Sequence, residues 1–323
     1  MMIRDTDYTF AVARIRANER YLLTKSDIEN LITAKDYSAS VSYLSSKGYL
    51  SSKNETDVSD ITSYQQKKLW NLLNECVPYK DELEVFTAIN DFFNIKAAIK
   101  SFFAEKDSDG YFIYPTSVDT RLLKEACTYR NFDLLKDDFK DALKEAYEAV
   151  STTKNGQYAD LICDVYALSY MRKKASSIKN VIINDIADFI ADSTNMKILY
   201  RCLMTDKNDE FILKALCDSK SFEKEQLLKT VRTNDGFTSL FEGELSQGAK
   251  ILVTDFAKFE KWCDDKITEK IKGAKYEFFG FSPICAYYYA KQAEIKSVRL
   301  ILSAKQRNIG EDIIRERVRE LYV

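Results

Sequence analysis

An acidic segment is the strongest candidate for chemistry in this sequence. It reads DDFKD and runs from Asp137 to Asp141. Carboxylates at positions i and i+4 share one face of a helix, where Asp137, Asp138 and Asp141 could together bind Mg²⁺. A bound Mg²⁺ ion could in turn hold a diphosphate, so a helix over this segment could support metal-assisted chemistry.

The surroundings of this segment favour a structural role instead. Its spacing resembles the DDxxD pattern of all-helical prenyl-diphosphate enzymes, and NDIAD at 184–188 partly resembles their second metal motif. That second segment follows too closely, however, and it lacks the Ser/Thr and Glu of the motif. Basic residues interleave with the acids and apolar residues occupy the other side, as on a solvated amphipathic helix: Lys136, Lys140, Lys144, Leu134, Leu135, Phe139 and Leu143. A Mg²⁺-dependent prenyl-type enzyme using Asp137, Asp138 and Asp141 stays an alternative.

Other reactive motifs give little support for catalysis. The chain contains no histidine, which excludes His-dependent triads and imidazole acid–base chemistry. Its seven cysteines form no CxxC pair, so we expect free, mostly buried thiols. The segment GELSQGAK, Gly243–Lys250, resembles a phosphate-binding P-loop. In a P-loop the Lys directly follows the second Gly, whereas here Ala249 separates them. We therefore interpret the segment as a loop between helices. We therefore predict no catalytic, cofactor-binding or metal-binding residues.

The composition predicts an all-α fold. Nine Gly and three Pro in 323 residues are too few for many strands joined by tight turns. A hydrophobic fraction of 46% allows one large core or several small ones. The formal net charge of −2 gives no indication of a nucleic-acid partner. No apolar run approaches the roughly 18 residues of a membrane span, so we predict no direct span.

One helical pattern occurs three times, as DFFNIKAAIKSFF, DSTNMKILYRCLM and AEIKSVRLIL. The equivalent residues Lys96, Lys197 and Lys296 lie 101 and 99 residues apart. A further helical segment precedes each copy: 59–77, 158–172 and 253–272. This period is too long for a solenoid. It predicts three helical-bundle domains of about one hundred residues: 1–110, 111–210 and 211–323.

The first two copies share an Asp-x-x-Asn motif, formed by Asp91 and Asn94 and by Asp192 and Asn195. Asn is a poor residue for a helix interior, and the Asp one turn earlier lies on the same face. The motif indicates either a repeated polar contact, between helices or with a partner, or a local cap or solvated face. The third copy has Glu294 in place of Asn and lacks the motif.

The third copy also contains helix-start signals. Ser282 is the expected N-cap and Pro283 the first helical residue, since the missing N–H of Pro costs nothing there. We expect this helix to reach Ser303, a length of about 30 Å. Phe279 and Phe281, just before it, predict either core packing or an exposed contact with a partner.

Both ends of the chain resemble one known family. The C-terminal stretch GFSPICAYYYAKQAEIKSVRLILSAKQRNIGEDIIRERVREL is similar to the end of the C subunit of bacterial and archaeal V-type (A-type) ATPases, the counterpart of the d subunit in eukaryotic V-ATPases. The N-terminal FAVARIRANERYLLTKSDIENLITAKDY resembles the opening of the same family, with its Arg-rich first helix and Leu-Leu pair. The three units extend the resemblance over the whole chain.

The resemblance implies a funnel-shaped all-α protein with pseudo-threefold symmetry on the cytoplasmic face of a membrane rotor ring. It further implies that a central cavity receives the lower end of the central shaft. Such a protein rotates with the ring and the shaft and transmits torque between ion translocation and ATP synthesis or hydrolysis, without binding nucleotide or a cofactor. A generic helical scaffold for other partners is the remaining alternative.

Six charged residues are candidate contacts with the ring or the shaft: Arg14, Arg16, Lys96, Lys197, Glu294 and Arg299. Two lie in the Arg-rich first helix and the other four in the repeated helices. The competing interpretation for each is a solvated surface or an internal salt bridge. Glu294 shares a helical face with Tyr287, Ala290 and Ile301, so we expect it to be partly buried and paired.

Overall fold

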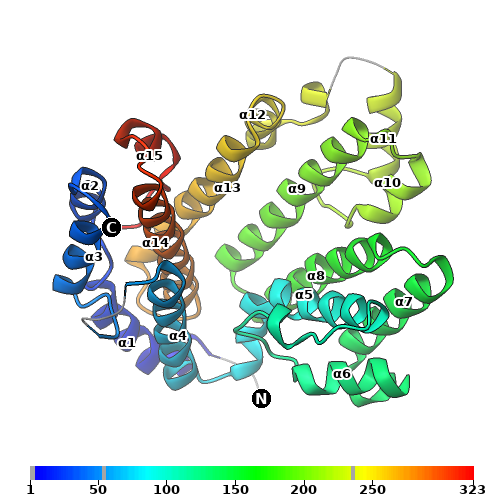
Figure 1. Ribbon diagram of the computed structural model, residues 1–323, viewed down its shortest axis with the longest axis horizontal. Coiled ribbons are helices and arrows are strands. Elements are labelled where there is room, and N and C mark those ends of the chain that lie inside the picture. The colour runs from blue at the N-terminus through cyan, green and yellow to red at the C-terminus, as the bar shows by residue number, and fades with distance from the viewer. Residues whose placement is uncertain (1–3, 53–55, 234–236) are drawn as a thin grey trace. The chain divides into compact units, whose positions relative to one another are not determined.

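A computed structural model of the chain describes residues 4–52, 56–233 and 237–323. Within these ranges the secondary structure is helical and contains no strand (Figure 1). The all-α prediction is therefore confirmed. The α-helices are α1 (Thr9–Glu19), α2 (Lys25–Thr33), α3 (Tyr37–Ser46), α4 (Val58–Cys76), α5 (Glu84–Phe103), α6 (Thr120–Tyr129), α7 (Asp137–Thr153), α8 (Gln157–Ile178), α9 (Val181–Met204), α10 (Asp209–Ala215), α11 (Lys224–Thr233), α12 (Gly243–Leu252), α13 (Phe256–Ile271), α14 (Ser282–Gln306) and α15 (Glu311–Arg317).

The chain forms two compact units. One contains Met1–Lys80, Asn180–Ile183 and Thr254–Val323, and the other contains Asp81–Lys179 and Asn184–Val253. The division into three repeats at residues 110 and 210, and the funnel shape, stay predictions.

In the first unit the two ends of the chain build one core around α14. This 25-residue helix packs against α1, α2, α3 and α4 from the N-terminal part and against α13 and α15 from the C-terminal part. Ile301 and Leu302 of α14 are fully buried with Leu31 of α2 and Leu44 of α3. Each such side chain contributes about 1.5–3 kcal/mol when it is removed from water. This shared core joins segments that are far apart in the sequence.

In the second unit α5 is the central helix, and it packs against α6, α7 and α8 (Figure 1). Phe92 of α5 is 1% exposed. Its ring lies 5.4 Å from Phe139 of α7 and 5.6 Å from Tyr170 of α8. Aromatic pairs at such distances stabilise a core beyond their buried area. One copy of the repeated helix is thus the core element of its own bundle.

Two local expectations were wrong. The segment interpreted as a loop is helix α12, because Leu245, Ala249 and Leu252 fall at helical spacing and are all buried. Ser282 is the first residue of α14 rather than its cap, and its hydroxyl instead accepts a hydrogen bond from Asn180 Nδ2 at 2.7 Å. Pro283 is therefore the second residue of α14 rather than the first, although it still lies in the first turn.

The two aromatic residues before α14 have different environments. Phe281 is 2% exposed and its ring contacts Tyr8, at 6.2 Å between centroids. Phe279 is 55% exposed. Core packing therefore describes Phe281, whereas a partner contact stays a prediction for Phe279.

Candidate functional site

The repeated motif residues clamp a loop in the second unit. Asn94, on α5, is 0% exposed. Its Nδ2 donates to the carbonyl of Ile113 at 2.9 Å, and its Oδ1 accepts from the backbone N–H of Ile113 at 2.8 Å. An amide side chain carries both a donor and an acceptor, so one Asn satisfies both backbone groups of one residue. No carboxylate could make the same pair of bonds.

Asp91, one turn earlier on α5, binds the next part of the same loop. Its carboxylate accepts from the backbone N–H groups of Ser117 at 2.6 Å and Val118 at 3.3 Å. The hydroxyl groups of Thr116 and Ser117 donate to it as well. Charge-assisted bonds of this kind are about twice as strong as neutral ones. The motif thereby fixes the approach of the chain to α6.

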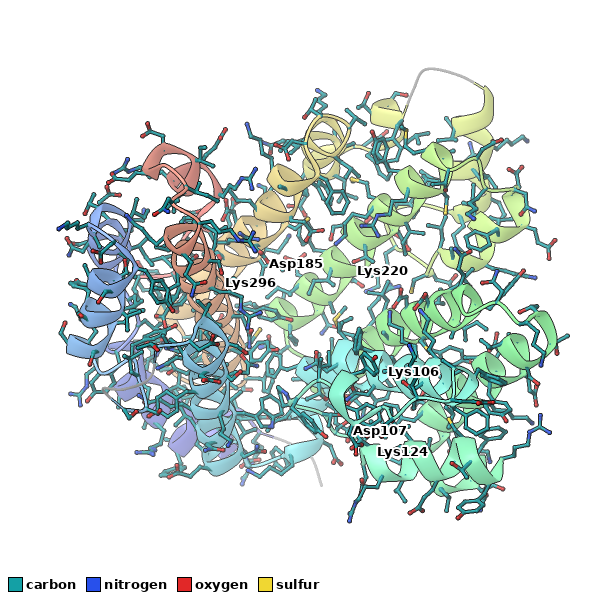
Figure 2. All side chains as sticks on the ribbon, in the orientation of Figure 1. Lys106, Asp107, Lys124, Asp185, Lys220 and Lys296 are labelled. Atoms are coloured by element: carbon teal, nitrogen blue, oxygen red, sulfur yellow. The ribbon has the colours of Figure 1, made fainter. Side chains whose placement is uncertain are left out.

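Exposed ion pairs tie the beginning of this loop to α6. Lys124 Nζ lies 3.0 Å from Asp107 (both labelled in Figure 2) and 2.8 Å from Asp109. Because all three side chains are well exposed, each pair contributes little to stability on its own. The buried motif residues therefore supply most of the restraint on the loop.

The second copy of the motif makes the same kind of clamp. Asn195 on α9 donates to the carbonyl of Cys217 at 2.8 Å and accepts from its N–H at 2.9 Å. Asp192 accepts from the hydroxyl groups of Ser219 and Ser221. Burial raises the pKa of Asp192, and these two hydroxyl donors only partly oppose that effect. The clamped loop leads into α11, just as the first leads into α6.

The third copy uses a carboxylate in the position of the amide. Glu294 of α14 is 1% exposed, and its Oε2 accepts from the backbone N–H of Leu23 at 2.6 Å. Leu23 precedes α2, so the third clamp closes on the N-terminal part of the chain. The other carboxylate oxygen pairs with Lys291, whose Nζ also lies 4.7 Å from the ring centroid of Tyr49. Glu294 is therefore paired, as predicted, and it is more deeply buried than the partial burial we expected.

These clamps decide between the two interpretations of the motif. The polar side chains bind loops of the same chain, so the motif makes a repeated polar contact rather than a solvated face. This contact joins a helix to a loop, and not two helices as one form of the hypothesis had it. The sequence analysis missed the loop residues that complete it. Short Ser/Thr clusters at 116–117 and 219–221, just before α6 and α11, were the available signal.

The two predicted arginines of α1 lie in internal contacts. Arg14 pairs with Glu75 of α4 at 3.1 Å, and both side chains are substantially exposed. Arg16 pairs with Glu19 at 2.7 Å. Its Nη2 also donates to the carbonyl groups of Ala274 at 2.6 Å and Glu277 at 2.7 Å. Arg16 thus holds the segment before α14, and its role as a partner contact stays a prediction.

The remaining candidates differ in their surroundings. Lys96 is paired with Asp164 of α8 at 2.7 Å and its side chain is only 16% exposed, so it forms an internal salt bridge. Lys197 is half-buried on α9. Arg299 of α14 is exposed, and its Nη2 donates to Thr62 Oγ1 at 3.0 Å. Of the six candidates, Arg299 best combines exposure with a defined position.

The acidic segment begins at the first residue of α7, with Asp137 and Asp138 in the first turn. Asp138 pairs with Lys173 of α8 at 2.8 Å. In the NDIAD segment, Asp188 pairs with Arg172 at 2.8 Å and with Lys220 at 2.7 Å (Figure 2 labels Lys220). No group of three or more potential ligands in the described ranges is placed to hold a metal ion. The geometry gives no support to the diphosphate-enzyme alternative.

The thiols are free and buried, as predicted. All seven cysteines are buried without disulfide partners. Burial raises the pKa of the Cys127 thiol to about 12. The protonated thiol is a poor nucleophile and a poor metal ligand. These residues therefore act as small apolar side chains.

No described helix is both long and apolar enough to cross a membrane. The described residues form an all-helical protein in which the repeated motif side chains stabilise loops of the same chain.

Comparison with known proteins identifies the family. The family described as ATP synthase (C/AC39) subunit matches residues 11–317, so the chain belongs to that family. A curated relative is the C subunit of the V-type sodium ATPase of Enterococcus hirae. It is 24% identical over 318 residues, which cover 95% of this chain and 97% of the relative. The resemblance to the C subunit of V-type ATPases is thereby confirmed.

Proposed function

We propose that the chain is a central-stalk component of a rotary V-type ATPase or ATP synthase. In this role it joins the membrane rotor ring to the central shaft and transmits torque between ion translocation and ATP synthesis or hydrolysis. It has no catalytic role of its own. The observation that carries the proposal is the family match across residues 11–317.

The clamps provide physical support for a mechanical role. A coupling element must resist deformation, because torque is lost wherever loops yield under load. Asn94 and Asn195 each fix a loop through a two-bond amide contact to a single residue. A buried polar group that loses its partner costs about 1–3 kcal/mol. Each clamped loop therefore resists displacement relative to its long helix.

The proposed partners are the ring subunits and the shaft subunits of the same complex. The proposed location is the cytoplasmic face of the membrane, where the chain is a peripheral part of the complex. Arg14, Arg16, Lys96, Lys197, Glu294 and Arg299 stay its proposed contact residues. The geometry favours Arg299, because it is exposed, over Glu294, because that carboxylate is 1% exposed.

Co-purification from native membranes tests the proposal. An affinity-tagged chain should recover both the ring and the shaft subunits in fixed stoichiometry. Removal of the chain should abolish ATP-driven ion transport in membrane vesicles, while the catalytic head still hydrolyses ATP. Recovery of the chain without either partner would leave only the generic scaffold. A parallel assay with Mg²⁺ and a prenyl diphosphate should detect no binding, and tight binding would revive the enzyme alternative.

A further inference from the structure

An elongated groove follows one face of α14 in the first unit. It encloses about 420 Å³ and has walls from α13 and α15. On α14 its lining residues recur at helical spacing, from Lys296 through Arg299 to Ser303, and Arg307 continues this spacing directly after the helix. At 1.5 Å per residue this stretch is about 16 Å long. The groove has the length of about three turns of a second helix.

The lining of this groove combines apolar and basic side chains. Apolar contacts come from Leu300 of α14, from Ile313 and Ile314 of α15 and from Ile309 before α15. Ile313 is 50% exposed and Ile309 is 37% exposed. Exposed apolar residues lined up beside charged ones mark interaction sites more often than solitary exposed residues do.

More basic than acidic side chains line the groove. Five basic side chains line it: Lys296, Arg299, Arg307, Arg317 and Arg319. Only two acidic residues, Glu260 and Asp264, do so. Asp264 of α13 pairs with Lys296, which Figure 2 labels, and with Arg319 at 3.0 Å. These pairs neutralise part of the positive charge where α13 lines the groove. Arg307 and Arg317 also line the groove and are both exposed.

We propose that this basic groove binds an acidic amphipathic helix of a partner protein. Apolar residues of the partner at i, i+3, i+4 and i+7 would contact Leu300, Ile309 and Ile313, as in other helix-in-groove complexes. Flanking Asp or Glu side chains would pair with Arg307 and Arg317, whose guanidinium groups bind carboxylates in a two-pronged geometry. The inference rests on the proposed function, because the partner would be another protein of the same complex.

Fluorescence anisotropy with two designed peptides tests the groove directly. The first probe is a helical peptide of four turns with Leu on one face and Glu on both flanks, and the second has Lys in place of every Glu. We expect the full chain to bind the Glu peptide and not the Lys peptide. Arg307→Glu with Arg317→Glu should weaken binding about tenfold or more. Arg121→Glu, a control at a side chain that is 85% exposed in the other unit, should leave it unchanged.

Several outcomes would overturn the inference. Equal binding of both peptides would show that the basic side chains do not determine binding. Unchanged binding by the double variant would show that the peptide does not bind in this groove. Displacement of the Glu peptide by tripolyphosphate, together with no effect of Ile313→Ser, would identify a small-anion site instead. The double variant should also lose co-purification with the complex. If it co-purifies like the unaltered chain, the inference fails and the proposed function stands. If the unaltered chain recovers no other part of an ATPase, the proposed function itself fails.

Discussion

The amide clamp of Asn94 predicts a specific loss of stability. The substitution Asn94→Asp keeps the size of the side chain and removes one donor. The carbonyl of Ile113 then loses its 2.9 Å hydrogen bond and faces a carboxylate oxygen at a position that is 0% exposed. An unpaired buried acceptor costs about 1–3 kcal/mol, and burial of the new charge adds to this. We therefore expect the free energy of unfolding to fall by about 3 kcal/mol.

Thermal and urea unfolding measure this loss. For a domain of about 150–250 residues, 1 kcal/mol shifts Tm by about 2–4 °C, so we expect a decrease of about 6–12 °C. The effect should shrink in acid, because a protonated carboxyl can donate to the Ile113 carbonyl. The folded state thus raises the pKa of the new carboxyl. The loss is small below the ordinary Asp value of about 4 and grows as pH rises through the raised value.

Two comparisons make the test decisive. Asn131→Asp is the matched control, since Asn131 is exposed in the same unit, and it should change stability by less than about 0.5 kcal/mol. Asn195→Asp should reproduce the Asn94→Asp loss, because its contacts to Cys217 are equivalent. Hydrogen exchange should also accelerate in the loop at 113–118. Equal stability of Asn94→Asp and Asn131→Asp, with unchanged exchange in this loop, would refute the clamp.

Three further predictions follow from buried and titrating groups. Glu294→Gln should destabilise the chain by about 3–5 kcal/mol, because it leaves Lys291 buried without its counter-charge. In a double-mutant cycle measured by urea unfolding, adding Lys291→Met to Glu294→Gln should recover much of that loss. Equal losses in the single and double variants would contradict the pairing. Burial opposes ionisation of Asp27, but hydrogen bonds from groups including Lys47 outweigh it and lower its pKa below 3.8. The ionised Asp27 carboxylate therefore stabilises the fold above its ordinary pKa, and this stabilisation is lost as pH falls through the lowered pKa. Asp27→Asn should make the free energy of unfolding fall less steeply in acid. An unchanged acid dependence of that free energy would count against this. Because burial raises its pKa to about 12, the Cys127 thiol should resist iodoacetamide at pH 8 in the native chain and react with it in guanidinium. Peptide mass spectrometry measures the labelling. Rapid labelling of the native chain would contradict the burial of Cys127.

Helix positions and helix faces could be predicted from the sequence because they depend on local periodicity. The segments predicted at 59–77, 158–172 and 253–272 correspond to α4, α8 and α13. The error at Gly243–Lys250 came from giving more weight to two glycines than to the buried spacing of Leu245, Ala249 and Leu252. Glycine lowers helix propensity, but packing of an apolar face overrides that preference.

The partners of the motif residues could not be predicted in this way. The spacing of Asp91 and Asn94 placed both on one face of a helix, yet it did not indicate that Ile113 or Ser117 would lie opposite. The same holds for the charged candidates. Arg16 and Glu19 are close in sequence and could be paired by spacing alone, whereas the Arg16 contact to Ala274 spans 258 residues.

The sequence by itself determined that this chain is helical, that a helix recurs about every hundred residues, and that both ends resemble one family of ATPase components. Those features follow from periodicity and residue type, which act over a few turns of helix. Only the tertiary structure decided that Glu294 meets the backbone of Leu23, 271 residues away, and that three separate helices enclose a basic groove. Such contacts depend on which distant segments the shared core brings together. Burial of apolar area favours close packing, but no local stretch of sequence specifies which distant segment will pack against it.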